Sequence, residues 1–166
     1  VVDNYGIING FVNDGGTTVK LYSFSNNSAY KNVYATMATL YIGQSKCFYD
    51  TVDVATIVDQ VGSTNIFLAQ VVCTATFDVL GSIFHISDSE FAAITIADGA
   101  GKNKFNNCTM GSVSITGDRS SFVGCSSSST FTINASADRT RIEVCESDTS
   151  VVDNGTNSVL IGNQLF

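Results

Sequence analysis

The repeating unit of this chain is clearest in Lys104-Phe105-Asn106-Asn107-Cys108 and in the Ser112-Val113-Ser114-Ile115-Thr116 that follows. The next segments repeat it, first as Ser-Phe-Val-Gly-Cys (121–125) with Thr-Phe-Thr-Ile-Asn (130–134), then as Arg-Ile-Glu-Val-Cys (141–145). Each unit contains two short strand-forming segments, with polar turn residues between units. A fixed period of this kind indicates a solenoid, in which each repeat buries its apolar face by stacking on its neighbours.

Two columns of large apolar residues extend this pattern along the chain at a nearly constant spacing. The first column is Phe11, Tyr30, Phe48, Phe67, Phe84, Phe105, Phe122, Ile142 and Val159. The second column is Leu21, Leu40, Ile57, Phe77, Ile94, Val113, Phe131 and Val151. We therefore predict an all-β fold, a single-stranded parallel β-helix of about eight short rungs of 17–21 residues.

The composition agrees with this fold and excludes some partners. The 166 residues fit one domain; only 14% are charged, and Pro and Trp are absent. The net charge is −7 and the eight Lys and Arg residues are scattered along the sequence, so we expect no nucleic-acid partner. The sequence contains no apolar stretch that predicts a membrane span, so we expect no membrane partner either.

The N-terminal part is less regular than the rest. Residues 1–16 contain four glycines and fit the period poorly, so we predict an N-terminal cap or attachment segment there and the β-helix over residues 17–166. The stretch from Ala29 to Leu40 also admits a short helix, which would interrupt one rung.

Three of the five cysteines recur at one position of the repeat. Cys108, Cys125 and Cys145 each follow a core residue by three positions. Stacked rungs lie about 4.8 Å apart, which is compatible with disulfides between neighbours. The favoured interpretation is free thiols that fill a corner of the core.

The two columns differ in their outward neighbours. The strands of the second column alternate apolar residues with Ser and Thr, which is typical of a sheet that faces water. The first column has apolar neighbours as well, which indicates a sheet covered on both faces. Because no segment is left over to cover it, we predict that the chain self-associates through an interface formed by Ile66, Leu68, Ile83, His85, Val123 and Leu160.

The rungs that read Asn-x-Phe-x-x-Cys, as in Asn103-Lys104-Phe105-Asn106-Asn107-Cys108, resemble those of right-handed parallel β-helices, more narrowly the phage tailspike and pectin-lyase-like group. The resemblance covers residues 40–166. It implies a right-handed coil, and for the phage members a homotrimer of three parallel coils that lie side by side on the virion. The members of this group that cleave their receptor are much longer chains than this one.

The sequence offers acidic pairs but no clear catalytic set. Glycosidic cleavage uses two carboxylates, and the candidates are Asp88 with Glu90, Asp50 with Asp53, and Asp118 with Asp138. Turn-capping or solvated carboxylates are the favoured interpretation of these pairs. His85 is the single histidine; three copies could surround a trimer axis and hold a metal, but an ordinary interface residue is favoured. We therefore assign no catalytic, cofactor or metal site.

The expected function is structural: a phage virion protein, trimeric and tailspike-like, which stabilises the capsid as a head decoration protein or forms a spike. Its expected partners are copies of itself, viral capsid or tail proteins, and, for a spike, a host surface glycan. The enzymatic alternative is a receptor-binding tailspike fragment that hydrolyses or cleaves polysaccharide. A secreted adhesin fragment is a third alternative.

Overall fold

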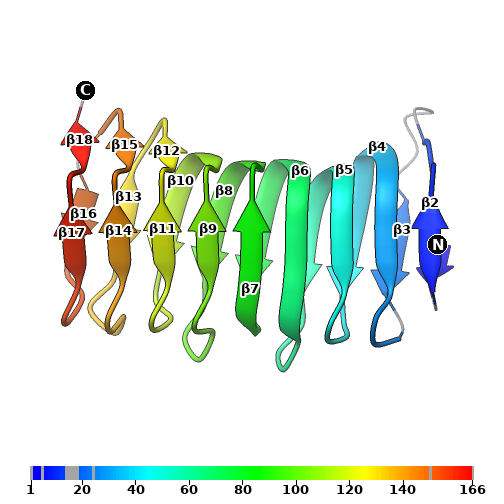
Figure 1. Ribbon diagram of the computed structural model, residues 1–166, viewed down its shortest axis with the longest axis horizontal. Coiled ribbons are helices and arrows are strands. Elements are labelled where there is room, and N and C mark those ends of the chain that lie inside the picture. Colours follow the sequence, from blue (N-terminus) through cyan, green and yellow to red (C-terminus); the bar gives the residue numbers. More distant parts are fainter. Residues whose placement is uncertain (1, 5, 14–18, 24, 150, 166) are drawn as a thin grey trace.

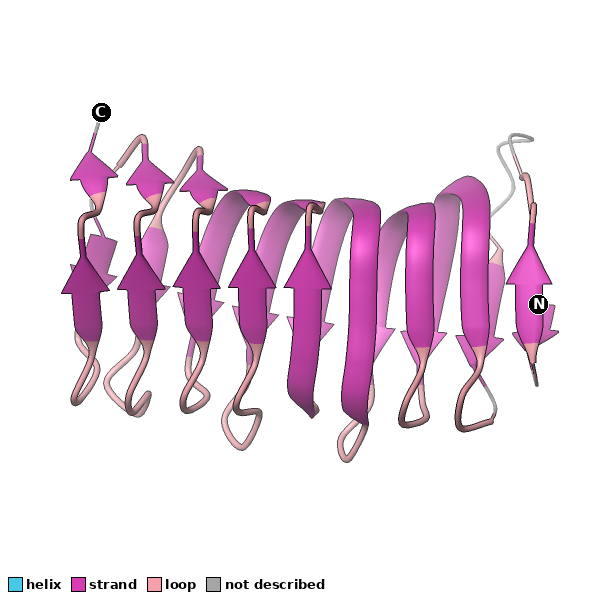
Figure 2. Ribbon diagram, in the orientation of Figure 1, coloured by secondary structure: helices cyan, strands magenta, loops and turns pink. Residues whose placement is uncertain are grey.

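The computed structural model describes residues 2–4, 6–13, 19–23, 25–149 and 151–165. These residues form one coil of parallel strands that advances along a single axis (Figure 1). The chain ascends on the near side of Figure 1, descends on the far side and moves from right to left, so the coil is right-handed. Figure 2 shows strands and loops and no helix among these residues, which confirms the prediction of an all-β parallel β-helix.

Each rung crosses three sheets. The first sheet, on the near side of Figure 1, contains β2 (Ile7–Asn9), the first parts of β4 (Ala29–Ile42), β5 (Phe48–Asp59) and β6 (Thr64–Val79), and then β7 (Ser82–Ser87), β9 (Lys104–Asn106), β11 (Ser121–Val123), β14 (Arg141–Glu143) and β17 (Val159–Ile161). The short second sheet contains the middle parts of β4, β5 and β6, the starts of β8 (Glu90–Ile96) and β10 (Thr109–Ile115), and β12 (Ser126–Ser127), β15 (Glu146–Ser147) and β18 (Gln164–Leu165). The third sheet contains β1 (Val2–Asn4), β3 (Lys20–Ser23), the last parts of β4, β5, β6, β8 and β10, and β13 (Phe131–Ile133) and β16 (Val151–Asp153).

Backbone bends with positive φ bound the first sheet on both sides. The residues before it, which we call the turn column, are Asn27, Lys46, Asn65, Ile83, Lys102, Arg119, Arg139 and Asn157. The residues after it in the same eight rungs, the bend column, are Asn32, Thr51, Gln70, Asp88, Asn107, Gly124, Val144 and Gly162, and Gly10 follows β2 in the same way. The spacing from each member to the next is identical in the two columns, so together they define the rungs. The eight members of each column agree with the predicted rung number.

The core is a stack of side chains from the first and third sheets. On the third sheet the predicted column from Leu21 to Phe131 is buried throughout, and Val151 packs against it. On the first sheet, Phe105 and Phe122 stack with ring centroids 4.5 Å apart and planes 5° apart. Identical or similar side chains thus lie on one another in successive rungs, as the period predicted.

The N-terminal residues join the same sheets. β1 pairs in parallel with β3, and β2 with β4. The predicted boundary between residues 16 and 17 falls in 14–18, outside the described residues. The helix that Ala29 to Leu40 admitted does not form, because this stretch is the strand β4 and pairs with β5 along its length. Within the described residues, no helix has the length and apolarity needed to cross a membrane.

Candidate functional site

An aromatic strip lies on the outer face of the first sheet. Phe48, Phe67 and His85 occupy equivalent outward positions in three successive rungs. The two phenylalanines are 36% and 43% exposed, respectively, and the imidazole of His85 stacks on the ring of Phe67 at 5.0 Å. The ammonium group of Lys31 lies 5.3 Å from the ring centroid of Phe48. Large apolar rings that are held exposed and adjacent to one another mark a surface suited to a partner.

This strip replaces half of the predicted interface. The predicted outward orientation of Ile66 and Leu68 is wrong, because these side chains are 0% and 1% exposed in the core. Leu160 is likewise in register with the inward Ile142; it is 45% exposed because no described rung covers it on its C-terminal side. Conversely, Phe48 and Phe67 were predicted to be in the core but face outward.

A one-residue slip explains the reversal. Phe84 follows the turn residue Ile83 directly, whereas Phe105 is the third residue after Lys102. Phe84 is therefore in register with Ile66, not with Phe67. A shift of one residue exchanges the two faces of a strand, so aligning one phenylalanine with the next placed Ile66 and Leu68 on the wrong side. The short step from Phe67 to Phe84 and the long step from Phe84 to Phe105 mark the slip.

The other three predicted interface residues are not in the core. His85 is half-buried within the aromatic strip. Val123 faces outward on β11 and is half-buried, farther along the same sheet than Phe67. Ile83 lies in the turn column and lines a surface depression together with Lys102 and Arg119.

A groove follows the bend column on the opposite side of the first sheet from the turn column. Two adjoining depressions, of about 300 and 360 Å³, share Gln70 and Val72. The first is also lined by Asn32, Val33, Tyr34, Thr51, Val52 and Asp53, and the second by Asp88, Ser89, Glu90, Asn107 and Thr109. Amides, hydroxyls and carboxylates therefore converge on one continuous corner.

Two carboxylates of this groove are electrostatically linked. Asp53 and Glu90 both pair with Val72 in the strand register, so they lie two rungs apart, roughly 10 Å at the usual strand spacing. Burial, and then the negative charge of Glu90, raise the pKa of Asp53. The Oδ1 atom of Asp53 is buried without a hydrogen-bond partner among the described residues.

The acidic pairs suggested by the sequence are distributed differently. Asp88 and Glu90 line the same depression, whereas Asp50 lies on the first sheet and accepts a hydrogen bond from the hydroxyl of Thr51. Asp118 and Asp138 occupy equivalent turns, and the backbone N–H of Asp138 donates to Asp118 Oδ1 at 2.9 Å. Hydrogen bonds from Asn157 and Arg139 lower the pKa of Asp138. Asp118 and Asp138 therefore cap turns, which was the favoured interpretation of this pair.

All five cysteines are buried free thiols. Cys108, Cys125 and Cys145 stack in successive rungs, 1%, 2% and 5% exposed, so the sulfur atoms fill a corner of the core as predicted. The hydrogen bond between Cys108 and Cys125 lowers the pKa of Cys108 and raises that of Cys125 to about 12. A thiol held protonated and out of solvent is a poor nucleophile.

Within the described residues, no three His, Cys, Asp or Glu side chains of the chain are grouped to hold a metal ion. The chain matches no family model, no curated protein and no solved structure at a significant level. Its function must therefore be inferred from its own residues and surfaces.

Proposed function

We propose that this chain is a structural protein of a phage virion, a homotrimer of side-by-side β-helices that decorates and stabilises the capsid or forms a short spike. The observation that carries the proposal is the aromatic strip of Phe48, Phe67 and His85. Exposed rings on successive rungs gain burial when a second coil packs alongside. The virion placement rests on the resemblance of the Asn-x-Phe-x-x-Cys rungs to phage tailspikes.

The trimer is tested by mass measurement under native conditions. The expected mass is about three times 17.6 kDa. Phe67→Asp should shift the mass towards that of a monomer, because a carboxylate in the interface would be desolvated without a partner. The matched control is Thr132→Asp, which places the same charge on the outward face of β13. A monomeric native chain, or a Phe67→Asp variant that stays trimeric, contradicts the proposed assembly.

The capsid role has a separate test. Particles that lack this protein should release their DNA at a lower temperature than complete particles, and adding back the purified protein should restore the release temperature. Immunogold labelling of complete particles distinguishes head from tail. If removal leaves the release temperature unchanged and gold is found on tails alone, the spike role replaces the stabilising role.

A polysaccharide hydrolase is the second candidate, and the observation that favours it is the groove with Asp53 and Glu90. Their rung spacing of roughly 10 Å is slightly above the separation of about 6.5–9.5 Å between the carboxyl groups of inverting glycosidases. The raised pKa of Asp53 suits a proton donor. Incubation with host polysaccharide should then release new reducing ends, and Asp53→Asn and Glu90→Gln should each abolish that release. Absence of new ends leaves the structural function alone.

A further inference from the structure

Charges of opposite sign gather on the two sides of the first sheet. Six of the eight cationic residues lie in the turn column or two positions after it, and we call them the basic edge: Lys46, Lys102, Lys104, Arg119, Arg139 and Arg141. Six acidic residues lie around the bend column, the acidic edge: Asp50, Asp53, Asp88, Glu90, Glu143 and Glu146. The cations are far apart in the sequence, and the coil brings them together.

The basic edge is strongest in the rungs of β9, β11 and β14. Lys102 and Arg119 adopt φ values of 59° and 55°, a conformation that costs most residues other than glycine roughly 1–2 kcal/mol. Asparagine tolerates this conformation and occupies the same column at Asn27, Asn65 and Asn157. The backbone therefore does not explain why cations stand here.

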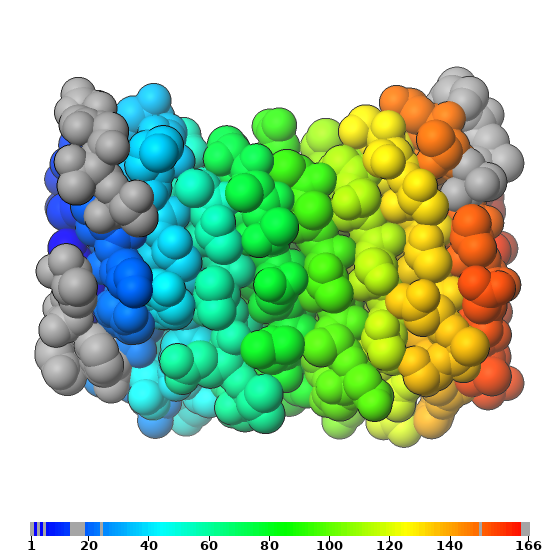
Figure 3. All heavy atoms as spheres, turned by 180° about the vertical axis from the view of Figure 1, so that it is seen from behind, coloured from blue at the N-terminus to red at the C-terminus, as the bar shows by residue number. Residues whose placement is uncertain are grey.

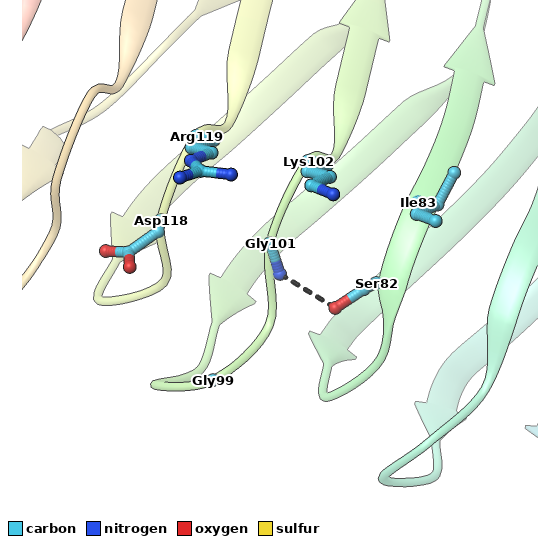
Figure 4. Close-up of a pocket in the computed structure, with 7 residues that line it drawn as sticks. All are labelled: Ser82, Ile83, Gly99, Gly101, Lys102, Asp118 and Arg119. Atoms are coloured by element: carbon cyan, nitrogen blue, oxygen red, sulfur yellow. Dashed lines mark hydrogen bonds between the residues drawn. The ribbon is translucent and has the colours of Figure 1, made fainter.

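A depression of about 240 Å³ lies between these cations. Lys102 and Arg119 line it together with Ser82, Ile83, Gly99, Gly101 and Asp118. In Figure 4 the guanidinium group of Arg119 extends towards Lys102, whereas the carboxylate of Asp118 points away from both. Figure 3 shows the molecule from behind, with each rung packed on the next along the axis. The depression has the size and charge to hold a carboxylate side chain.

Ion pairs within the chain leave much of the positive charge of the basic edge available to a partner. Arg139 pairs with Asp138 and Arg141 with Glu143, each at 2.6 Å, and both arginines are more than half exposed. Exposed pairs of this kind contribute little and exchange readily. Lys102, Lys104 and Arg119 form no ion pair with the described part of the chain.

We propose that the basic edge of one copy docks on the acidic edge of a second copy, so that the coils pack side by side and point the same way. This inference rests on the proposed trimer and names the charged surfaces that meet in it. When coils are arranged around an axis parallel to their own, with the first sheet inward, the turn column of each faces the bend column of the next. The aromatic strip, which continues into Lys104 in the same outward column, then faces the axis, and the contact is heterologous and closes as a ring.

The heights of the charges agree with this arrangement. Lys102 and Lys104 belong to the rung directly after that of Asp88 and Glu90, about 4.8 Å along the axis. Long Lys and Arg side chains span such a step. In the rung of β14, Arg139 and Arg141 are level with Glu143 and Glu146. An antiparallel arrangement of the same faces would bring this rung opposite the aromatic rungs near the N-terminus instead.

A charge-swap series tests the inference, with native mass and dissociation constant as readouts. Lys102→Glu with Lys104→Glu, and separately Asp88→Lys with Glu90→Lys, should each raise the dissociation constant of the trimer at least tenfold. Combining all four substitutions should restore it, because the two edges remain complementary with their signs exchanged. Asp78→Lys with Asp98→Lys, which changes the net charge by the same amount as the acidic-edge swap but elsewhere, is the control for that swap and should leave the assembly intact.

The outcomes separate this inference from the proposed function. Circular dichroism of each variant shows whether the coil is folded, and only folded variants are compared. If the wild-type chain is a trimer and both single-edge variants form trimers with the same dissociation constant, the edge docking is overturned and the trimer is kept. A trimer that is weakened by each swap and not restored by their combination also overturns it. A monomeric wild-type chain overturns the trimer and the docking with it.

Discussion

The imidazole of His85 stacks on the phenyl ring of Phe67, with centroids 5.0 Å and planes 11° apart, on the outer face of two adjacent rungs. The strand register places these residues directly opposite each other. Cross-strand ring pairs stabilise a sheet and also form a flat platform for a partner. The pair therefore connects the stability of the coil with the surface proposed for its assembly.

The stacking energy of this pair can be measured by a double-mutant cycle. Phe67→Ala, His85→Ala and the double variant should show a coupling of about 0.5–1 kcal/mol in the free energy of unfolding in urea. The matched cycle uses Ser114 and Thr132, which are neighbours on the outward face of the third sheet and lack rings. A Phe67–His85 coupling no larger than that of the control pair would show that the rings only lie near each other.

The corrected orientation of β6 predicts opposite effects for neighbouring substitutions. Leu68→Asp should unfold the coil, because it buries a charge without a partner in the core, at a cost of several kcal/mol. Phe67→Asp should keep the far-ultraviolet circular dichroism of a β-protein, since its side chain lies on the outer face of the coil and not in its core. A folded but dissociated Leu68→Asp variant would instead restore the orientation that the sequence suggested.

Asp59 is a buried carboxylate, 1% exposed, that holds two rungs together. It accepts hydrogen bonds from the hydroxyl of Ser63 and from the backbone N–H groups of Leu80 and Gly81. Asp59→Ala should therefore cost about 3 kcal/mol in urea unfolding, because these donors lose their acceptor. Asp59→Asn keeps one acceptor oxygen and should cost less. Equal losses for both variants would mean that the charge, and not the hydrogen bonds, matters.

The buried thiols predict a loss of stability at high pH. Burial raises the pKa of Cys73 to about 11, and that of Cys125 is about 12, against 9.0 for an ordinary thiol. Between pH 9 and 11 the unfolded chain therefore releases protons that the folded chain retains, so the free energy of unfolding falls as the pH rises. Urea midpoints at pH 7.5, 9 and 10.5 measure the decline. It should be smaller in Cys73→Ala, and an identical decline in that variant would exclude the thiol as its source.

The sequence was sufficient to predict which side chains of the third sheet face the core, but not which side chains of the first sheet do. Val113, Ile115, Phe131 and Ile133 alternate strictly with Ser and Thr, so their inward direction follows from the pattern. On the first sheet, apolar residues occupy both faces around Phe67, and the pattern alone gives no direction. The turn and bend columns place Phe84 in register with Ile66, but they are defined by backbone φ values and so become visible only in the structure.

The candidate surfaces divide in the same way. His85 was placed outward from its neighbours, and the acidic residues of the groove were noted as pairs. The basic edge as a whole was not predicted, since its cations are widely separated in the sequence, above all between Lys46 and Lys102, and look scattered. Only the return of the chain to the same corner in every rung reveals that they share one surface.

By itself, the sequence determined the rung period, the strand content and the buried thiol column, because each depends on residues that recur at one nearly fixed spacing. The tertiary structure decided which side of the first sheet each apolar residue faces and which charges lie side by side. The physical reason is that stacking brings together residues one rung apart, while the length of the rung varies along the coil. A single-residue difference in that length exchanges core for surface, so the direction of a side chain follows from the coil as built.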